Sequence, residues 1–453
     1  MNTIIAEKLW KCQQKNSRID NFFKEFGISM LMKRSNFQKS NGCPAVDVLK
    51  YLFDLVFEHS SIYLDSVFFK KTGLSKNTAY RFMNSPYFNW VKLLYLTAIK
   101  FIKMLLPLTS EKRVNCLIFD DTLYSRSRSK SVDMLTRVFD HVTNKYVKGF
   151  KLLTCAWTDG NSTVPVMFRP LVSLNPDMII NSIPENMDKR RNSYKIRKSA
   201  QMPATDAMFE ILEKIELKLM DVRYVLFDSW FSFPSIISKV CTYGVNVICA
   251  VKKMPLVRYG FRGKTYNLKQ IYEMLDHKKD IITASAMVSI TNQNGGKHKA
   301  KIVFVRTNKS TDDWYAILST DTELSDEEIV RIYGKRWNIE VCFKICKHYL
   351  KLDTEYEGRS FESLYAHSAI VFLRYIMLSH ENRISEDPRT CGQLFFLMYE
   401  ELKDISYSEA VIMLISTVLD KANSDKIISD EQLDSLVDIF MASIPDFICF
   451  YHG

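Results

Sequence analysis

Short apolar segments that end at an acidic residue constrain the fold of this 453-residue chain most strongly. VNCLIF leads directly into Asp120, and YVLF leads directly into Asp228. Apolar runs of this kind are typical of strands that are buried on both faces. A helical pattern over 204–220 precedes the second run, and a further apolar run, VNVICAV, follows it. This alternation of strands and helices predicts an α/β core.

The segments around this core have different patterns. Apolar residues recur at helical spacing before residue 107, whereas 251–320 contains β-branched runs around Asn294-Gly295-Gly296, a strong hairpin signal. Ser325 and Glu328 form a capping box that begins a long helix, expected over 326–350. The expected regions are a helical N-terminal region, the first part of the core, a β-rich insertion, the second part of the core and an acidic helical C-terminal region, over 1–112, 113–250, 251–320, 321–380 and 381–453.

The charge of the chain indicates an anionic partner. After residue 380 there are 14 acidic and 5 basic residues, a net charge of −9, so the total of +11 leaves +20 for residues 1–380. A body this basic favours nucleic acid first and an anionic membrane second. The N-terminus lacks the apolar segment of a signal peptide, and His367 and Arg374 interrupt the longest apolar stretch of the C-terminal third. We therefore expect a cytoplasmic protein with no membrane partner.

Ten cysteines are scattered singly, which is typical of reduced thiols in the cytosol. Cys342, Cys346 and His348 could suggest a zinc site, but no second pair of Cys or His residues follows at suitable spacing. Buried core thiols are the expected outcome for these cysteines.

A candidate DNA-binding motif lies in the N-terminal region. Gly73 separates two short helical patterns, and Ser75 is a natural N-cap for the second. A short helix, a glycine turn and a polar-faced helix outline a helix-turn-helix. Its outward-facing residues would be Lys76, Asn77 and Arg81. An ordinary helical hairpin with a solvated face explains the same pattern equally well.

The two aspartates suggest a metal site. Ligand sites in α/β sheets lie at the carboxyl ends of strands, where Asp120 and Asp228 are expected. Carboxylates from two strands can bind Mg²⁺ or Mn²⁺, which prefer oxygen ligands. A single aspartate at a strand end is usually a turn or cap residue, so only the pair is informative.

Four polar residues of the long helix share one face. Tyr333, Arg336, Glu340 and Lys347 lie at about 0°, −60°, −20° and −40° around the helix axis. Glu340 could complete the metal site while the two cations contact phosphates. A solvated face with an Arg336–Glu340 salt bridge would explain this helix taken alone. An adjacent face, expected to pack inward, carries Ile332, Ile339, Phe343 and Leu350.

Together these residues resemble the DDE transposases of bacterial insertion sequences, and specifically the family called insertion sequence four. Asp120-Asp121-Thr122 fits the family's D-x-T pattern, and Asp228 fits the second acid. The spacing of Tyr, two residues, Arg, three residues, Glu, six residues and Lys is met in full from Tyr333 to Lys347. The D-x-T register favours Asp120 over Asp121 without excluding the latter.

The resemblance covers about 113–380 and implies an RNase H-like core with a β-rich insertion. It implies that Asp120, Asp228 and Glu340 hold Mg²⁺ or Mn²⁺, as two ions, and that Tyr333, Arg336 and Lys347 contact transposon-end DNA. The implied activity is cut-and-paste transposition, with terminal inverted repeats and target DNA as double-stranded partners and a DNA hairpin as an intermediate. No organic cofactor is needed.

The implied activity also predicts how the protein assembles. Two element ends must be brought together, so we expect a homodimer on DNA, with the acidic tail as the candidate interface. The alternative is that the tail packs on its own core.

A stand-alone metal-dependent nuclease and a catalytically inactive DNA-binding regulator remain alternatives for the function. A glycosidase would explain neither three ordered acids nor the basic body.

Overall fold

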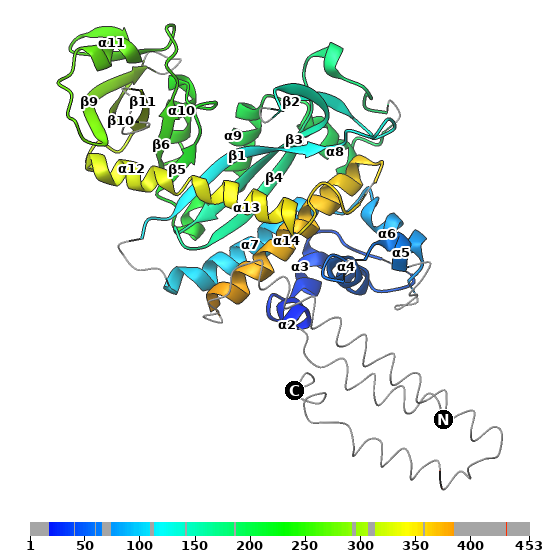
Figure 1. Cartoon of the computed structure of the whole chain (residues 1–453). Helices are drawn as coiled ribbons and strands as arrows, with labels where there is room; N and C mark the ends of the chain where they lie inside the picture. The colour runs from blue at the N-terminus through cyan, green and yellow to red at the C-terminus, as the bar shows by residue number, and fades with distance from the viewer. Residues whose placement is uncertain are drawn as a thin grey trace. The chain divides into compact units, whose positions relative to one another are not determined.

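The computed structural model (Figure 1) describes residues 18–384 and residue 432, apart from short gaps at 40, 59, 66–73, 109–112, 141–142, 185–186, 292–295, 307–312 and 357. The expectations for the acidic tail therefore lie outside the described residues. Contacts divide the chain into two compact units. Of the described residues, 18–34, 38–79 and 380–384 belong to one unit, and 35–37 and 80–379 belong to the other.

The described N-terminal residues are helical, as the sequence predicts. The helices are α2 (Arg18–Glu25), α3 (Ile28–Arg34), α4 (Ala45–Asp54), α5 (Ile62–Leu64), α6 (Lys76–Met83) and α7 (Trp90–Leu105). Phenylalanine rings form the core of the first unit, where Phe22 lies 4.4 Å from Phe26 and 6.0 Å from Phe53 between ring centroids. Amphipathic helices of this length depend on such packing for their stability.

Helix α6 begins at the predicted cap. The hydroxyl of Ser75 accepts a hydrogen bond of 3.2 Å from the backbone N–H of Thr78. Lys76, Asn77 and Arg81 are exposed, as predicted. Gly73 and the helix expected before it lie outside the described residues, so the helix-turn-helix stays a prediction.

The second unit is built on one eleven-stranded sheet. Its strands are β1 (Cys116–Ser125), β2 (Thr136–Asp140), β3 (Lys145–Thr158), β4 (Thr163–Leu171), β5 (Tyr224–Phe227), β6 (Asn246–Val251), β7 (Arg258–Phe261), β8 (Lys264–Asn267), β9 (Ile282–Thr291), β10 (Lys297–Arg306) and β11 (Trp314–Ser319). Its helices, besides α7 and the second half of α6, are α8 (Asn192–Ala200), α9 (Ala204–Lys214), α10 (Pro234–Cys241), α11 (Leu268–Glu273), α12 (Asp326–Gly334), α13 (Trp337–His348) and α14 (Phe361–Ile384), whose last residues, from His380, are assigned to the first unit.

The first half of the sheet has the RNase H-like arrangement. β3 pairs antiparallel with both β1 and β4, whereas β5 pairs parallel with β1, and β6 pairs parallel with β5. The order β4-β3-β1-β5-β6 thus joins an antiparallel meander to two parallel strands. The mixed α/β fold predicted from the sequence is confirmed.

The β-rich stretch continues the same sheet. β11 pairs antiparallel with β6, and β10, β9, β7 and β8 follow in that order. The predicted hairpin is present as β9 and β10, with its turn at 292–295 outside the described residues. The β-rich stretch is therefore an extension of the core sheet. The free edge of β6 needs hydrogen-bond partners, and β11 supplies them.

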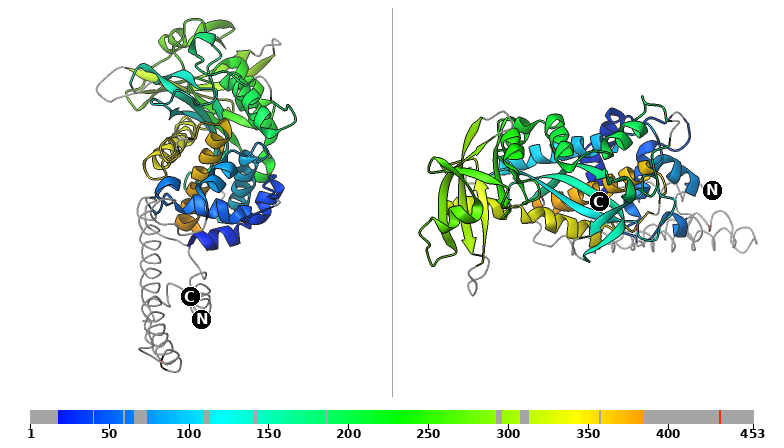
Figure 2. Two further views of the ribbon diagram at one scale, coloured as in Figure 1. Left: turned by 90° about the vertical axis from the view of Figure 1, so that its right-hand side faces the viewer. Right: turned by 90° about the horizontal axis from the view of Figure 1, so that it is seen from above.

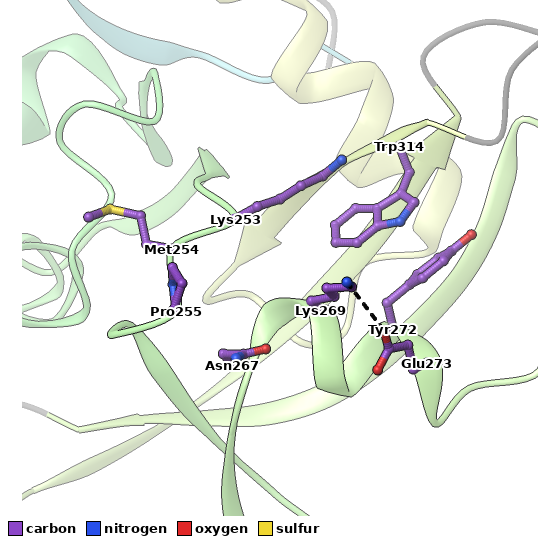
Figure 3. Close-up of a pocket in the computed structure, with 8 residues that line it drawn as sticks. All are labelled: Lys253, Met254, Pro255, Asn267, Lys269, Tyr272, Glu273 and Trp314. Carbon is purple, nitrogen blue, oxygen red and sulfur yellow. Dashed lines mark ion pairs between the residues drawn. The ribbon is translucent and has the colours of Figure 1, made fainter.

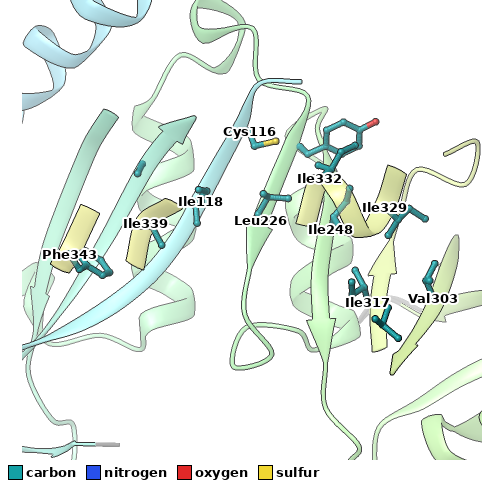
Figure 4. Packing of buried hydrophobic residues seen from close by; sticks show 13 residues of the cluster. Cys116, Ile118, Leu226, Ile248, Val303, Ile317, Ile329, Ile332, Ile339 and Phe343 are labelled. Carbon is teal, nitrogen blue, oxygen red and sulfur yellow. The ribbon is translucent and has the colours of Figure 1, made fainter. Parts of the chain in front are cut away.

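Helices α12 and α13 cover one face of the sheet through a continuous apolar cluster (Figure 4). Ile118 of β1 and Leu226 of β5 pack in this cluster with Ile339 of α13. Ile332, Ile339, Phe343 and Leu350 are all buried, as the helical pattern predicts. In the left view of Figure 2, these yellow helices and the green helices of 204–241 lie on opposite sides of the strands. No described helix is long and apolar enough to cross a membrane.

The predicted single helix over 326–350 is two helices. The capping box of Ser325 and Glu328 is present, but α12 ends at Gly334 and α13 begins at Trp337. At the junction, the N–H of Lys335 donates to Ile332 and that of Arg336 to Tyr333, which is the tighter 3₁₀ pattern. Gly334 is a poor helix former, and tertiary contacts of Lys335 fix the break.

Candidate active site

Strand register brings two acids side by side. β1 and β5 run parallel, and their pairing ends with Phe119 opposite Phe227. Asp120 follows Phe119 and Asp228 follows Phe227, so the two acids lie at the same edge of this parallel pair of strands. Asp228 follows the end of β5, as predicted. Asp120 does not end its strand: β1 continues to Ser125, because β3 still pairs with it there.

Side-chain alternation separates Asp120 from Asp121. Asp120 shares a face of β1 with Cys116 and Ile118, both of which belong to the cluster under α13. Asp121 faces the other way, where its carboxylate lies 3.0 Å from Nζ of Lys151. Asp120 is therefore the acid that faces the helix bearing Glu340.

Arg336 connects Asp120 to Glu340. Its Nη1 donates to Asp120 Oδ2 at 3.1 Å, and its Nη2 donates to Glu340 Oε1 at 2.5 Å. Glu340 lies in the first turn of α13, one turn after Arg336. Burial alone would lower the pKa of Arg336, but Tyr333, Glu340 and Asp120 raise it above its usual value. The structure thus brings three of the predicted residues into direct contact, while Tyr333 lies under the guanidinium with its ring centroid 6.0 Å away.

Asp120 has an unusually high proton affinity. Burial, together with the charges of Asp228 and Asp121, raises its pKa to about 7 despite the lowering effect of Arg336. A carboxylate that is buried among other carboxylates is stabilised by a cation. The backbone N–H of Trp230 donates to Asp228 Oδ1 at 2.9 Å, which orients this second carboxylate.

These donors suit a hard divalent cation. Asp120, Asp228 and Glu340 would supply only carboxylate oxygens, the ligands that Mg²⁺ and Mn²⁺ prefer. Among the described residues, no group of three or more acidic, His or Cys side chains is already gathered in metal-binding geometry.

A cavity of about 980 Å³ opens over the two aspartates. Its charged lining comprises the acids Asp120, Asp121, Asp140 and Asp228 and the cations Arg137, Lys151, Lys252 and Lys347. Lys347 thus lines the same cavity as Asp120 and Asp228. Lys151 and Lys252 were not predicted, since strand pairing over long sequence distances brings them there. Trp230 also lines the cavity; it is 55% exposed and lies 4.6 Å under Nζ of Lys252.

A second cavity, of about 390 Å³, lies in the β-rich part (Figure 3). Nζ of Lys253 lies 4.2 Å from the ring centroid of Trp314, and the Trp314 ring stacks on Tyr272. The one acid in its lining, Glu273, pairs with Lys269 at 3.9 Å. This cavity lacks the paired acids that distinguish the larger one.

The basic cluster of 189–198 is only partly solvated. Arg197 is buried, where it pairs with Asp133 and donates to Glu362 Oε1 at 2.6 Å. Two acids distant in sequence thus neutralise Arg197, so this cation is not available to a phosphate. Arg190 and Arg191 both bond the nearby Asp188.

Comparisons with protein families agree with this geometry. The model for the DDE superfamily endonuclease matches residues 69–263, and the model for the transposase DDE domain matches residues 192–374. Asp120 lies in the first match, Glu340 lies in the second, and Asp228 lies in both. No curated protein matches the chain in sequence. Both models describe DDE domains of the endonuclease and transposase type, which indicates a nuclease-type enzyme and implies DNA as its substrate.

Proposed function

We propose that this chain is a cut-and-paste transposase of the insertion-sequence-four family that uses Asp120, Asp228 and Glu340 to hold two Mg²⁺ or Mn²⁺ ions. One observation carries the proposal: the β1–β5 register and the packing of α13 direct these acids to one edge of an RNase H-like sheet. Bound metal ions would activate the attacking oxygen and stabilise the charge on the scissile phosphate.

The residues around the acids would bind and orient DNA. Lys347, Lys151 and Lys252 line the cavity beside the aspartates, where they can neutralise backbone phosphates. Arg336 can form a bidentate contact with a phosphate, and Tyr333 packs against it. Exposed Lys76, Asn77 and Arg81 on α6 are the candidates for recognising terminal inverted repeats.

The strand chemistry follows from the family resemblance. Water first cuts one strand at the element end and leaves a 3′-hydroxyl. This hydroxyl attacks the opposite strand and forms a hairpin, which a second water reopens. The 3′ end then displaces a 3′-oxygen in target DNA and joins to the target, with one phosphodiester bond formed for each one broken. No side-chain nucleophile and no organic cofactor takes part.

The proposal is tested by cleavage of a duplex that carries the DNA bordering the gene, in Mg²⁺. Asp120→Ala, Asp228→Ala and Glu340→Ala should each abolish cleavage but still shift the duplex in a gel, because the basic surface is retained. Glu327→Ala, which removes an exposed acid from the first turn of α12, is the matched control and should cleave normally.

The outcomes separate the alternatives. Cleavage without preference for the bordering sequence, and without strand joining, would indicate a stand-alone nuclease. Binding without cleavage by the unaltered chain would indicate a catalytically inactive DNA-binding regulator. Cleavage by all three alanine variants would place the metal ligands elsewhere. The proposal also includes a homodimer on DNA and a cytoplasmic location.

A further inference from the structure

Arg336 bonds two of the three acids that the proposed metal site needs. Its two terminal nitrogens bond different carboxylates, Asp120 from β1 and Glu340 from α13, at 3.1 and 2.5 Å. The side chain of Arg336 is only 15% exposed, and that of Asp120 is 18% exposed. Charge-assisted hydrogen bonds at such sites are stronger than neutral ones. The guanidinium therefore acts as an internal counter-ion for both acids.

The backbone holds Arg336 in this place. It lies at the junction of α12 and α13, where its N–H donates to Tyr333 at 2.9 Å. The neighbouring Lys335 fastens the junction, since its Nζ donates to the carbonyl oxygens of Val114 at 2.6 Å and Asp159 at 3.1 Å. Arg336 can therefore leave the acids only by changing its own side-chain torsions, and α13 need not move.

A metal ion and Arg336 compete for the same oxygens. A divalent ion that bound both Asp120 and Glu340 would have to displace the guanidinium, which would then be left partly buried without an anion. A DNA phosphate beside the acids would supply that anion, in the bidentate geometry that guanidinium favours. Lys347 and Lys151, which line the adjacent cavity, mark where such a phosphate would lie.

We propose that Arg336 couples metal binding to DNA binding: it neutralises Asp120 and Glu340 in the free protein and moves to a phosphate when DNA docks, which frees the acids for the metal. This proposal rests on the proposed function. Because coupling between two ligands is reciprocal, DNA strengthens metal binding by the same factor by which metal strengthens DNA binding. The free protein is thereby kept from forming a fully loaded metal site.

The test is Mn²⁺ binding, measured on the full chain by the loss of the free-ion electron paramagnetic resonance signal. Without DNA, Arg336→Gln should bind Mn²⁺ at least about tenfold more tightly than the unaltered chain, as expected when a charge-assisted hydrogen bond is removed. Adding a duplex of the DNA bordering the gene should tighten Mn²⁺ binding by the unaltered chain about as much, and that by Arg336→Gln much less.

Lys347→Gln is the matched control, because it also removes one positive charge, from the cavity that Asp120 and Asp228 line. Lys347 lines the cavity but does not bridge Asp120 and Glu340, so this variant measures the purely electrostatic gain. That gain should be clearly smaller than the gain in Arg336→Gln. Arg336→Lys keeps the charge but loses the two-pronged guanidinium, so its gain in Mn²⁺ affinity should fall between those of Lys347→Gln and Arg336→Gln.

Equal Mn²⁺ affinities for Arg336→Gln, Lys347→Gln and the unaltered chain without DNA would overturn the coupling, and so would a duplex that leaves Mn²⁺ binding unchanged. If Arg336→Gln does not fold, the effect of DNA on the unaltered chain still decides. Failure of the proposed function looks different: Asp120→Asn would then bind Mn²⁺ as well as the unaltered chain, with and without DNA.

Discussion

Two adjacent aspartates in β1 have different environments because strand side chains alternate. Asp120 is turned toward Arg336 and the cluster under α13, whereas Asp121 bonds Lys151 across the β1–β3 pair. Their sequence positions alone leave open which of them is the first acid of the D-x-T pattern. The alternation of side chains along β1 gives a physical reason to prefer Asp120 as that first acid.

Asp121→Asn should therefore retain most of the cleavage activity, while Asp120→Asn should lose it. The side-chain amide that replaces the Asp121 carboxylate can still accept a hydrogen bond from Lys151, so the change is mild, and at most a few-fold loss in cleavage rate is expected. Single-turnover cleavage of a labelled duplex measures both variants. The reverse pattern, with Asp120→Asn active, would move the first acid by one residue.

Among the helices, the junction of α12 and α13 sets the position of the third acid. Arg336, Glu340 and Lys347 all follow the 3₁₀ turn at Lys335, so the regular helix α13 sets their spacing, and the turn changes only their spacing to Tyr333. Arg336 bonds both Asp120 and Glu340, and Lys347 lines the cavity.

Lys335→Met should loosen this junction. The thioether side chain keeps most of the packing but loses both hydrogen bonds to Val114 and Asp159, a loss of about 1–3 kcal/mol in the free energy of unfolding. Urea unfolding measures the change, and cleavage at saturating Mg²⁺ should also fall. Arg331→Met, an exposed position on α12, is the control. Unchanged unfolding and cleavage for Lys335→Met would show that other contacts fix the break.

Local signals in the sequence predicted local structure well. The cap at Ser75, the capping box at Ser325 and the hairpin of β9 and β10 each depend on neighbouring residues, and all are present. Pairings between distant segments could not be predicted. The ion pairs that bury Arg197 and the pairing of β11 with β6 join residues whose spacing in the sequence carries no periodic signal.

The same limit applies to the candidate site. Motif spacing selected Asp120, Asp228 and Glu340, and the helical ridge selected Arg336 and Lys347 as phosphate contacts. Neither showed that Arg336 bonds two of the acids, because this depends on how closely α13 packs on β1. The candidate residues could be selected from the sequence, but their contacts depend on three-dimensional packing.

For the chain as a whole, acid stability should depend on a buried ion pair in the second unit. Arg374 donates to both oxygens of Glu355, at 2.5 and 2.8 Å, and both side chains are almost fully buried. Burial alone would raise the pKa of Glu355, but Arg374 and His367 lower it to about 2. The ionised form is thus favoured in the folded state. Its stabilisation is complete above the ordinary pKa of 4.5 and is lost as the pH falls toward 2.

Glu355→Gln should cost about 3–5 kcal/mol in the free energy of unfolding at pH 7, because it removes the negative charge that faces the buried guanidinium of Arg374. The variant should also show a weaker fall in stability between about pH 4.5 and pH 2 than the unaltered chain. Urea unfolding at several pH values measures both effects. Glu327→Gln, at an exposed position, should change neither, and an unaffected Glu355→Gln would mean that the pair contributes nothing net.

The acidic tail provides a test of assembly. A chain that ends at residue 385 loses most of a segment whose net charge is −9, counted from residue 381, and which is a poor ligand for DNA. If the tail forms the dimer contact, this shortened chain should still bind and nick a single element end. It should fail to form paired-end complexes in a gel shift. A soluble shortened chain that still pairs ends would place the dimer contact elsewhere.

The pairing of β6 with β11 limits how the chain can be shortened or recombined. β6 reads NVICAV and is mostly buried, with β5 on one side and β11 on the other. Excising the β-rich stretch would leave this apolar strand with a bare row of N–H and C=O groups, open to pairing with another copy. The stretch is therefore not a detachable module, and a minimal nuclease made from this chain must give β6 a new neighbour or it will aggregate.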